Sequence, residues 1–235
     1  MEENTVFVKI YHGSEPALAL NSRELRRYSG YMQSGEMDDA LRELYAQVVD
    51  ELLPSVEYKV CYRRMKLERS EGKLLLPFDC TSADLEKLLA FSQEVVIFAA
   101  TAGLAIDRYI AKYQLISPAK ALVAQALGAE RIETLCNVFC DDIQKAAAGE
   151  GLSATPRYSP GYGDMPLATQ TDLFRLLDCN RQIGLSLNSS LLMMPSKSVT
   201  ALFGLAPSER CRTVHNNKCS SCSNTGCAFR DTSRS

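Results

Sequence analysis

The chain has 235 residues, a hydrophobic fraction of 46% and a formal net charge of −2 at pH 7. These values are ordinary for a globular protein with a buried core, and the near-neutral charge argues against a dedicated nucleic-acid-binding protein, which usually has a basic surface. No apolar run reaches membrane-spanning length, and the N-terminus lacks a basic segment followed by an apolar one. We therefore expect a cytoplasmic protein with no nucleic-acid or membrane partner.

The first third of the chain alternates between strand and helix patterns. Alternating apolar and polar residues predict strands over 5–10 and 57–67. A helix is expected to start after Asn21, and apolar residues at helical spacing predict another over 37–53, ended by Pro54. A turn at 71–72 and a short partner strand over 74–76 predict a hairpin at 57–76.

The remainder of the chain predicts a buried central strand and several helices. The continuous apolar run over 94–100 is typical of a central strand. Helices are expected over 84–91, 102–113, 118–148 and 169–177, and strands over 183–187 and 198–203. The hairpin breaks a strict strand–helix–strand order, so we expect an α+β (mixed α/β) domain. The sequence has no GxGxxG motif, Walker loop or fixed-period repeat.

The segment from Arg157 to Pro166 reads RYSPGYGDMP and contains two prolines, two glycines and two tyrosines. Proline fixes the backbone and glycine permits close approach to it, so this is a rigid loop rather than a helix or central strand. It fits a small flat or zwitterionic ligand whose carboxylate pairs with Arg157. The alternative interpretation is a rigid surface turn.

Three features together resemble the activation domain of cobalamin-dependent methionine synthase. They are the strand end Ala-Ala-Thr-Ala-Gly at 99–103, the Arg-x-x-Pro-Gly-Tyr loop starting at Arg157, and the Met-Met-Pro-Ser-Lys-Ser-Val segment at 193–199. The resemblance extends from about residue 84 to 203, and the residues before 84 resemble the family only in the order of their helices and strands. It divides the chain into an N-terminal α/β part of the same domain (1–80), an S-adenosylmethionine-binding core (81–207) and a cysteine-rich tail (208–235).

The resemblance implies a curved, largely antiparallel sheet with flanking helices and a shallow S-adenosylmethionine site. It also implies a partner that carries cobalamin, namely the cobalamin-binding module of methionine synthase or a related corrinoid protein. An external electron donor, flavodoxin or ferredoxin, would reduce the oxidised cobalt, which then takes the methyl group of S-adenosylmethionine. As a chain without the zinc, folate and cobalamin modules, this protein would support reactivation in trans.

The ligand-binding residues implied by the resemblance are Arg157, Ser159, Pro160, Gly161 and Tyr162, with Glu133 on the preceding helix. Arg157 would pair with the ligand carboxylate, the backbone around Pro160 would contact the adenine or amino-acid portion, and Tyr162 would pack on the sulfonium or the ring. Glu133 would meet the ammonium or sulfonium, the alternative being a solvated helix face. No catalytic acid or base is expected, because the sulfonium methyl is already activated.

The sequence departs from the family pattern at two places. Gly163 and Asp164 follow Gly-Tyr where the synthases usually have proline, so Asp164 is expected either to face the sulfonium or to cap the helix near Thr169. Met194 stands where tryptophan is expected, and the whole chain has no tryptophan. Met194 is interpreted either as an apolar surface for the corrin or as a packing residue.

The C-terminal tail carries Cys219, Cys222 and Cys227 at C-x2-C-x4-C spacing, with Cys211 or His215 available as a fourth ligand. Closely spaced thiolates suit zinc or an iron–sulfur cluster. His215 would favour zinc, and an iron–sulfur cluster would fit a reaction that needs one electron. The alternative is a solvated tail with free thiols or an adventitious disulfide. The five other cysteines are scattered singly, which is typical of reduced thiols.

Two other functions stay open from the sequence. The first is a distinct S-adenosylmethionine-dependent methyltransferase or an activator of another corrinoid methyl-transfer system. The second is a metal-stabilised interaction module in which the Arg157 loop packs against a partner. Binding of S-adenosylmethionine distinguishes the interaction module from the others.

Overall fold

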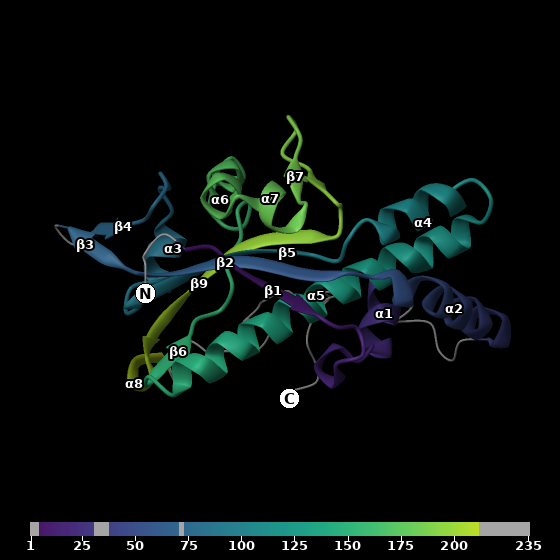
Figure 1. Ribbon diagram of the computed structural model, residues 1–235, viewed down its shortest axis with the longest axis horizontal. Helices are drawn as coiled ribbons and strands as arrows, with labels where there is room; N and C mark the ends of the chain where they lie inside the picture. The colour runs from purple at the N-terminus through teal and green to yellow at the C-terminus, as the bar shows by residue number, and fades with distance from the viewer. Residues whose placement is uncertain (1–4, 31–37, 71–72, 212–235) are drawn as a thin grey trace.

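The computed structural model describes residues 5–30, 38–70 and 73–211, and its centre is a five-stranded antiparallel sheet (Figure 1). Every neighbouring pair of strands runs antiparallel. The strand order is β1 (Phe7–Tyr11), β2 (Tyr58–Lys66), β5 (Glu94–Thr101), β9 (Ser198–Pro207) and β6 (Leu152–Ala154). The predicted class, mixed helices with a curved antiparallel sheet, is confirmed.

Strand β5 occupies the middle of the sheet, as its apolar sequence predicts. Each of its residues from Val95 to Thr101 is buried, and Ile97 lies between Arg63 on β2 and Leu202 on β9. Because a central strand is covered on both faces, apolar side chains at every position are stabilising there. The two faces of β5 contribute to two separate hydrophobic clusters.

One face of the sheet is covered mainly by the long helix α5, and helices α1, α2 and α4 pack on the same cluster. The ring of Phe139 on α5 lies 4.9 Å from that of Phe98 on β5, and burial of such a ring stabilises the fold by about 1.5–3 kcal/mol. The elements of this layer are η1 (Pro16–Leu18), α1 (Ser22–Tyr28), α2 (Asp39–Leu52), η3 (Leu53–Ser55), α4 (Ala105–Tyr113) and α5 (Pro118–Ala148).

The opposite face carries a second layer of shorter helices, which Figure 1 shows on the other side of the sheet from α5. Their buried side chains, such as Leu85, Leu173 and Ile183, pack on Val95 and Ile97. This layer contains α3 (Ala83–Leu88), α6 (Thr169–Leu177) and α7 (Cys179–Ile183), and α8 (Ser208–Cys211) follows β9.

The helix predictions over 118–148 and 169–177 are confirmed with their bounds. Pro118 stands in the first turn of α5, where its missing N–H costs no intrahelical bond. The side chain of Asn21 accepts hydrogen bonds from the N–H groups of Arg23 and Glu24, so the predicted helix start at Asn21 is confirmed as well.

The predicted hairpin at 57–76 is wrong in its pairing. Both edges of β2 are occupied, by β1 and β5, so no third strand can pair with it. The short strand β4 (Lys73–Leu75) pairs instead with β3 (Glu68–Ser70) in a separate two-stranded sheet. The predicted turn at 71–72 lies outside the described residues.

The predicted strand over 183–187 is also largely wrong. Ile183 is the last residue of α7, and Gly184 follows with a φ of 70° that ends the helix. Only β7 (Ser186–Leu187) is a strand, paired with β8 (Met193–Met194). Ile183 and Leu185 are both buried, and a short apolar run of this kind does not distinguish a strand from a buried helix end.

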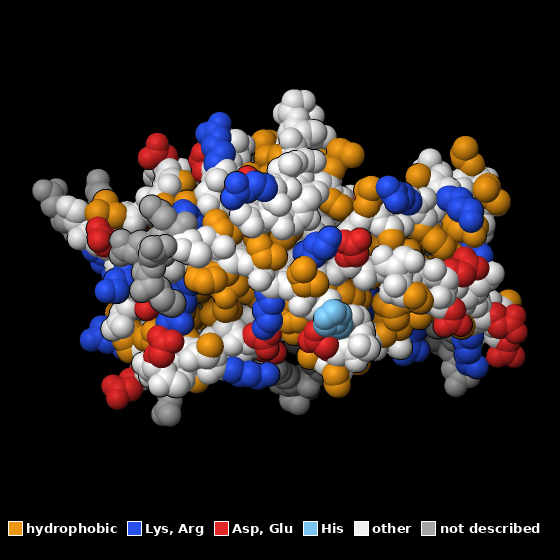
Figure 2. Space-filling model, viewed as in Figure 1, with side chains coloured by type: hydrophobic (Ala, Val, Ile, Leu, Met, Phe, Trp, Pro, Cys, Tyr) orange, Lys and Arg blue, Asp and Glu red, His pale blue; other side chains and the backbone are white. Residues whose placement is uncertain are grey.

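The surface seen in Figure 2 intersperses basic and acidic side chains and shows hydrophobic side chains over the end of α4. Leu115 and Ile116, in the connection from α4 to α5, are 88% and 73% exposed. In the described part of the chain, no helix combines the length and apolar character that a membrane crossing requires.

Candidate functional site

The Arg157 loop starts along the outer edge of the sheet. After β6 the chain stays beside β9: the N–H of Tyr158 donates to the carbonyl of Leu202 at 2.8 Å, and the N–H of Leu202 donates back at 2.9 Å. The N–H of Thr155 donates to the carbonyl of Gly204 at 2.8 Å, and the N–H of Gly204 donates to the Thr155 hydroxyl at 2.9 Å. The loop is therefore anchored to the sheet immediately at its first residues, which fixes the direction of the Arg157 side chain.

Arg157 reaches the exposed side of α5 and pairs there with Glu133. Its Nη2 donates to Oε2 of Glu133 at 3.0 Å and to Oδ1 of Asn137 at 2.9 Å. The side chain of Arg157 is 26% exposed and that of Glu133 is 42% exposed. Both bonds use the same nitrogen, and the guanidinium also hydrogen-bonds the Cys136 thiol, so part of its five N–H donors is left for a carboxylate.

Two thiols of α5, Cys136 and Cys140, lie next to the guanidinium. Burial alone would lower the pKa of Arg157, but the neighbouring Cys136, Glu133 and Cys140 raise the pKa above its ordinary value. Burial raises the pKa of Cys136, and it raises the pKa of Cys140 to about 12. The site therefore has a permanent cation beside neutral thiols, an arrangement suited to binding an anion rather than to nucleophilic catalysis.

The turn from Ser159 to Tyr162 is closed by its own backbone. The N–H of Tyr162 donates to the carbonyl of Ser159 at 3.2 Å, and the N–H of Gly161 donates to the carbonyl of Met165 at 3.0 Å. Pro160 is buried and Gly161 has a φ of 87°, whereas Tyr162 is 69% exposed. The turn is rigid and presents the Tyr162 ring to solvent. The carbonyl of Ser159 and the N–H of Gly161 are already hydrogen-bonded within the turn. Any main-chain contact from these residues to a ligand must therefore use the N–H of Ser159 or the carbonyl of Gly161.

Asp164 caps a helix, although not the one expected. Its carboxylate accepts hydrogen bonds from the Ser82 hydroxyl and from the backbone N–H groups of Ala83 and Asp84, at the start of α3. These hydrogen bonds, led by that of Ser82, lower the pKa of Asp164. The expectation that Asp164 caps the helix near Thr169 is wrong: α6 has Ala168 at its N-cap position, without a side-chain hydrogen bond.

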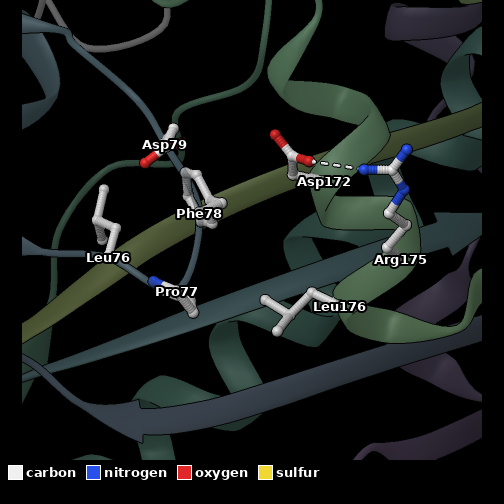
Figure 3. A pocket seen from close by; sticks show the side chains of 7 residues that line it. All are labelled: Leu76, Pro77, Phe78, Asp79, Asp172, Arg175 and Leu176. Carbon is white, nitrogen blue, oxygen red and sulfur yellow. Dashed lines mark hydrogen bonds and ion pairs between the residues drawn. The ribbon is translucent and has the colours of Figure 1, made fainter.

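A cavity of about 570 Å³ lies between α6 and the segment that precedes α3 (Figure 3). Figure 3 shows Phe78 and the ion pair of Asp172 with Arg175 facing it. None of the predicted ligand residues lines this cavity. The predicted ligand residues instead lie at the surface, where the side chain of Arg157 is 26% exposed and Tyr162 is 69% exposed.

Three of the predicted metal ligands, Cys219, Cys222 and Cys227, lie outside the described residues, as does His215. Cys211 ends α8. Across the described ranges, no group of three or more histidine, cysteine or acidic residues is arranged to hold a metal. The metal site in the tail stays a prediction.

The structure thus brings Arg157 and Glu133, which are 24 positions apart, into one ion pair, and the rest of the predicted ligand set continues along the same loop. Sequence reasoning missed Asn137, the second partner of Arg157. The signal was available, because Asn137 follows Glu133 by four positions on a helix and shares its face.

Comparisons with known proteins identify the fold and the family of the chain. No curated protein sequence matches the chain. The solved structure described as "Crystal Structure of the MetH Reactivation Domain bound to AdoHcy" is similar in fold, with a TM-score of 0.64, 16% sequence identity, and coverage of 88% of this chain and 80% of that one. The family model for the activation domain of vitamin B12 dependent methionine synthase matches residues 86–220, more than half of the chain. The chain therefore belongs to the family of the vitamin B12 dependent methionine synthase activation domain.

Proposed function

We propose that this protein binds S-adenosylmethionine at the Arg157 loop and supports, in trans, the reductive methylation of oxidised cobalamin carried by a methionine synthase or a related corrinoid protein. The family membership and the bound S-adenosylhomocysteine of the similar structure support a ligand of this type. The observation that carries the proposal is the pairing of Arg157 with Glu133 on the exposed side of α5.

An adjacent cation and anion are complementary to the amino-acid end of the ligand. Arg157 supplies a planar guanidinium that can bind a carboxylate with two parallel hydrogen bonds, and Glu133 supplies a carboxylate for the ammonium group. Asn137 holds Nη2 of Arg157 from the other side, so the guanidinium is positioned before the ligand arrives. A positioned guanidinium loses less conformational entropy on binding.

The exposed ring of Tyr162 fits the sulfonium end of the ligand or the face of the partner. An aromatic face attracts a cation such as a sulfonium. The methyl group moves without an acid or base: its carbon leaves the sulfur, the electron pair of that bond stays on sulfur, and reduced cobalamin, after accepting one electron from a flavodoxin- or ferredoxin-type donor, supplies the pair for the new bond. The task of this chain is therefore orientation.

Calorimetric titration of S-adenosylmethionine into the wild type and the Arg157→Ala variant tests the proposal. Loss of a charge-assisted pair is expected to cost about 2–3 kcal/mol of binding free energy. Arg181→Ala is the matched control, because Arg181 is an exposed arginine of α7 whose ion partner is Asp178. If the wild type gives no heat and no saturation, the Arg157 loop is a packing surface and the interaction module becomes the better interpretation.

Reactivation is measured separately with an oxidised methionine synthase that lacks its own activation domain, a reductant and S-adenosylmethionine. Wild-type protein is expected to restore turnover in trans, and Arg157→Ala is expected to do so only at higher ligand concentration. Restoration of a different corrinoid methyltransferase instead of methionine synthase would assign the protein to that system.

A further inference from the structure

Helix α5 carries a line of accessible residues that continues beyond Glu133. Gln125, Ala129, Glu133 and Asn137 follow one another at intervals of four, so they lie along one side of the helix. Gln125 and Asn137 are exposed, and Ala129 and Glu133 are half-buried. We call these four residues the α5 stripe. Arg157 pairs with its C-terminal half through Glu133 and Asn137.

A second cation meets the N-terminal end of the α5 stripe. Nζ of Lys197, in the segment between β8 and β9, donates to Oε1 of Gln125 at 2.6 Å. Gln125 and Glu133 are eight positions apart, which is about 12 Å along an α-helix. Ala129 lies between them, and its small side chain protrudes little from the helix. The stripe therefore has a polar group with a cation at each end and a small residue between them.

Lys197 is held in place by its stem and by its backbone. A Cβ at Gly128 would lie 2.8 Å from Cγ of Lys197 and 2.9 Å from Cγ2 of Ile106, so only glycine on α5 admits the stem. The carbonyl of Lys197 accepts a hydrogen bond from the N–H of Ala102 at 2.9 Å. The ammonium group is thus fixed at the helix rather than free in solvent.

The surroundings of Lys197 leave its charge poorly solvated. Burial lowers the pKa of Lys197, and the charge of nearby Asp107 opposes that shift only in part. Asp107 is itself occupied by the N–H and the hydroxyl of Ser196. An ammonium group whose hydrogen-bond partner is a neutral amide oxygen favours further acceptors such as hydroxyl oxygens or ring nitrogens.

We propose that Lys197 and Gln125 bind the nucleoside end of the ligand whose amino-acid end Arg157 and Glu133 bind, with the ligand extended along the α5 stripe. This inference rests on the proposed function and adds the second end of the same site. The ammonium of Lys197 donates to the ribose oxygens or the adenine ring nitrogens. Its bond to Gln125 orients the amide, whose NH2 group serves as a further donor.

Two ligands and two variants separate the ends of the site. S-adenosylhomocysteine has both ends, whereas 5′-methylthioadenosine has the nucleoside without the amino acid. Lys197→Met is expected to weaken the binding of both ligands by a similar factor of about 10–150, as expected for loss of one hydrogen bond from a charged donor. Arg157→Ala is expected to weaken S-adenosylhomocysteine at least tenfold and to leave 5′-methylthioadenosine unchanged. All four affinities are measured by calorimetry or by competition.

Lys145→Met is the matched control, since Lys145 is an exposed lysine of the same helix that lies eight positions, about 12 Å, beyond Asn137 at the end of the stripe. Gln125→Ala, which leaves the Lys197 stem in place, is expected to weaken both ligands as well. Thermal unfolding of each variant shows whether the fold is intact, and Lys197→Arg, which keeps a cationic donor, is expected to retain most of the affinity.

The outcomes distinguish this inference from the proposed function. If the wild type binds S-adenosylhomocysteine and both Lys197→Met and Gln125→Ala bind it equally well, the nucleoside assignment falls while the Arg157 site stands. The assignment is also overturned if Lys197→Met loses affinity for S-adenosylhomocysteine but keeps its affinity for 5′-methylthioadenosine. A wild type that fails to bind 5′-methylthioadenosine overturns it as well. A wild type that binds neither ligand overturns both proposals.

Discussion

The carboxylate of Asp164 accepts a hydrogen bond from the backbone N–H of Ala83 at 2.7 Å, and this bond joins two segments that are 81 positions apart. It ties the end of the Arg157 loop to the first turn of α3. A helix N-terminus has unpaired N–H groups and a partial positive charge, so a carboxylate there is stabilising. The geometry of the loop therefore depends on α3 as well as on the sheet edge.

Replacement of Asp164 by asparagine is expected to lower the thermal midpoint and to make stability less dependent on acid pH. The pKa of Asp164 is lowered in the folded state, so its contribution is complete above the unfolded value near 3.8 and is lost as pH falls through the lower folded value. Thermal scans from pH 2 to pH 6 measure this difference. A wild type and variant with identical pH profiles would show that the cap contributes nothing.

Gly163 lies in this loop and Gly151 precedes it, and alanine substitutions at the two positions test how tightly the loop is packed. A Cβ at Gly163 would lie 2.2 Å from Oη of Tyr158 and 2.8 Å from Oδ2 of Asp84, and Gly163 has a φ of 53°. Gly151 also has a positive φ, 74°, but a Cβ there would meet nothing within 4 Å. Both alanine variants carry the backbone cost of about 1 kcal/mol, and only Gly163→Ala adds the clash.

Chemical denaturation is therefore expected to show Gly163→Ala as the less stable variant by a further 1 kcal/mol or more, on the order of the cost of overpacking. S-adenosylmethionine affinity is expected to fall in Gly163→Ala and to stay unchanged in Gly151→Ala, because only Gly163 belongs to the loop. Equal losses in the two variants would mean that Tyr158 and Asp84 move aside freely.

The parts of this fold that the sequence predicts well are those with a single local cause. The apolar run over 94–100 identifies the central strand, and Pro118 and the long apolar periodicity identify α5. The strand pairing after Leu67 was not predictable locally, because it depends on β1 and β5 occupying both edges of β2. The same holds for Asp164, whose partner α3 is distant in sequence.

The candidate site shows the same division. The Arg157 loop is visible in the sequence because its prolines and glycines are contiguous, and its family resemblance pointed to Glu133. Lys197 became visible only when the structure placed it against Gln125, whereas the spacing of Asn137 from Glu133 was a signal that the sequence already carried. Contacts between a loop and a helix face depend on how the helix is rotated against the sheet, which no local pattern specifies.

A buried ion pair in the middle of α5 connects this helix to the N-terminal segment. Glu130 and Arg131 are each 1% exposed at the side chain and pair with each other. Arg131 also donates to the carbonyls of Leu18 and Ala19, and Glu130 accepts from the N–H of Asn21 at 3.1 Å. The pair satisfies backbone groups of a segment that would otherwise be buried without partners.

Arg131→Met is expected to destabilise the protein by about 3–5 kcal/mol, since it leaves the Glu130 carboxylate buried without its partner. The double variant Glu130→Gln, Arg131→Met is expected to recover part of that loss, because no charge is then buried. Urea unfolding of the two variants measures both values. A double variant less stable than Arg131→Met would show that hydrogen bonds from Glu130 to Asn21 and Thr134 outweigh the cost of burying its charge.

The last prediction concerns the cysteines of the C-terminal tail, whose spacing predicts a metal site. We expect protein purified without oxygen to contain iron or zinc in near-stoichiometric amount, held by Cys219, Cys222 and Cys227 with Cys211 or His215 as the fourth ligand. Metal analysis with visible absorption spectroscopy distinguishes the two, because an iron–sulfur cluster absorbs in the visible range and zinc does not. The Cys219→Ser, Cys222→Ser variant is expected to lose the metal. Cys61→Ser is the control, since Cys61 is buried in the sheet.

Binding of S-adenosylmethionine is expected to survive loss of the metal, because Arg157 is held by the sheet edge and α5. If anaerobic protein contains neither metal, these cysteines are free thiols and any electron needed by the partner must come directly from its external donor.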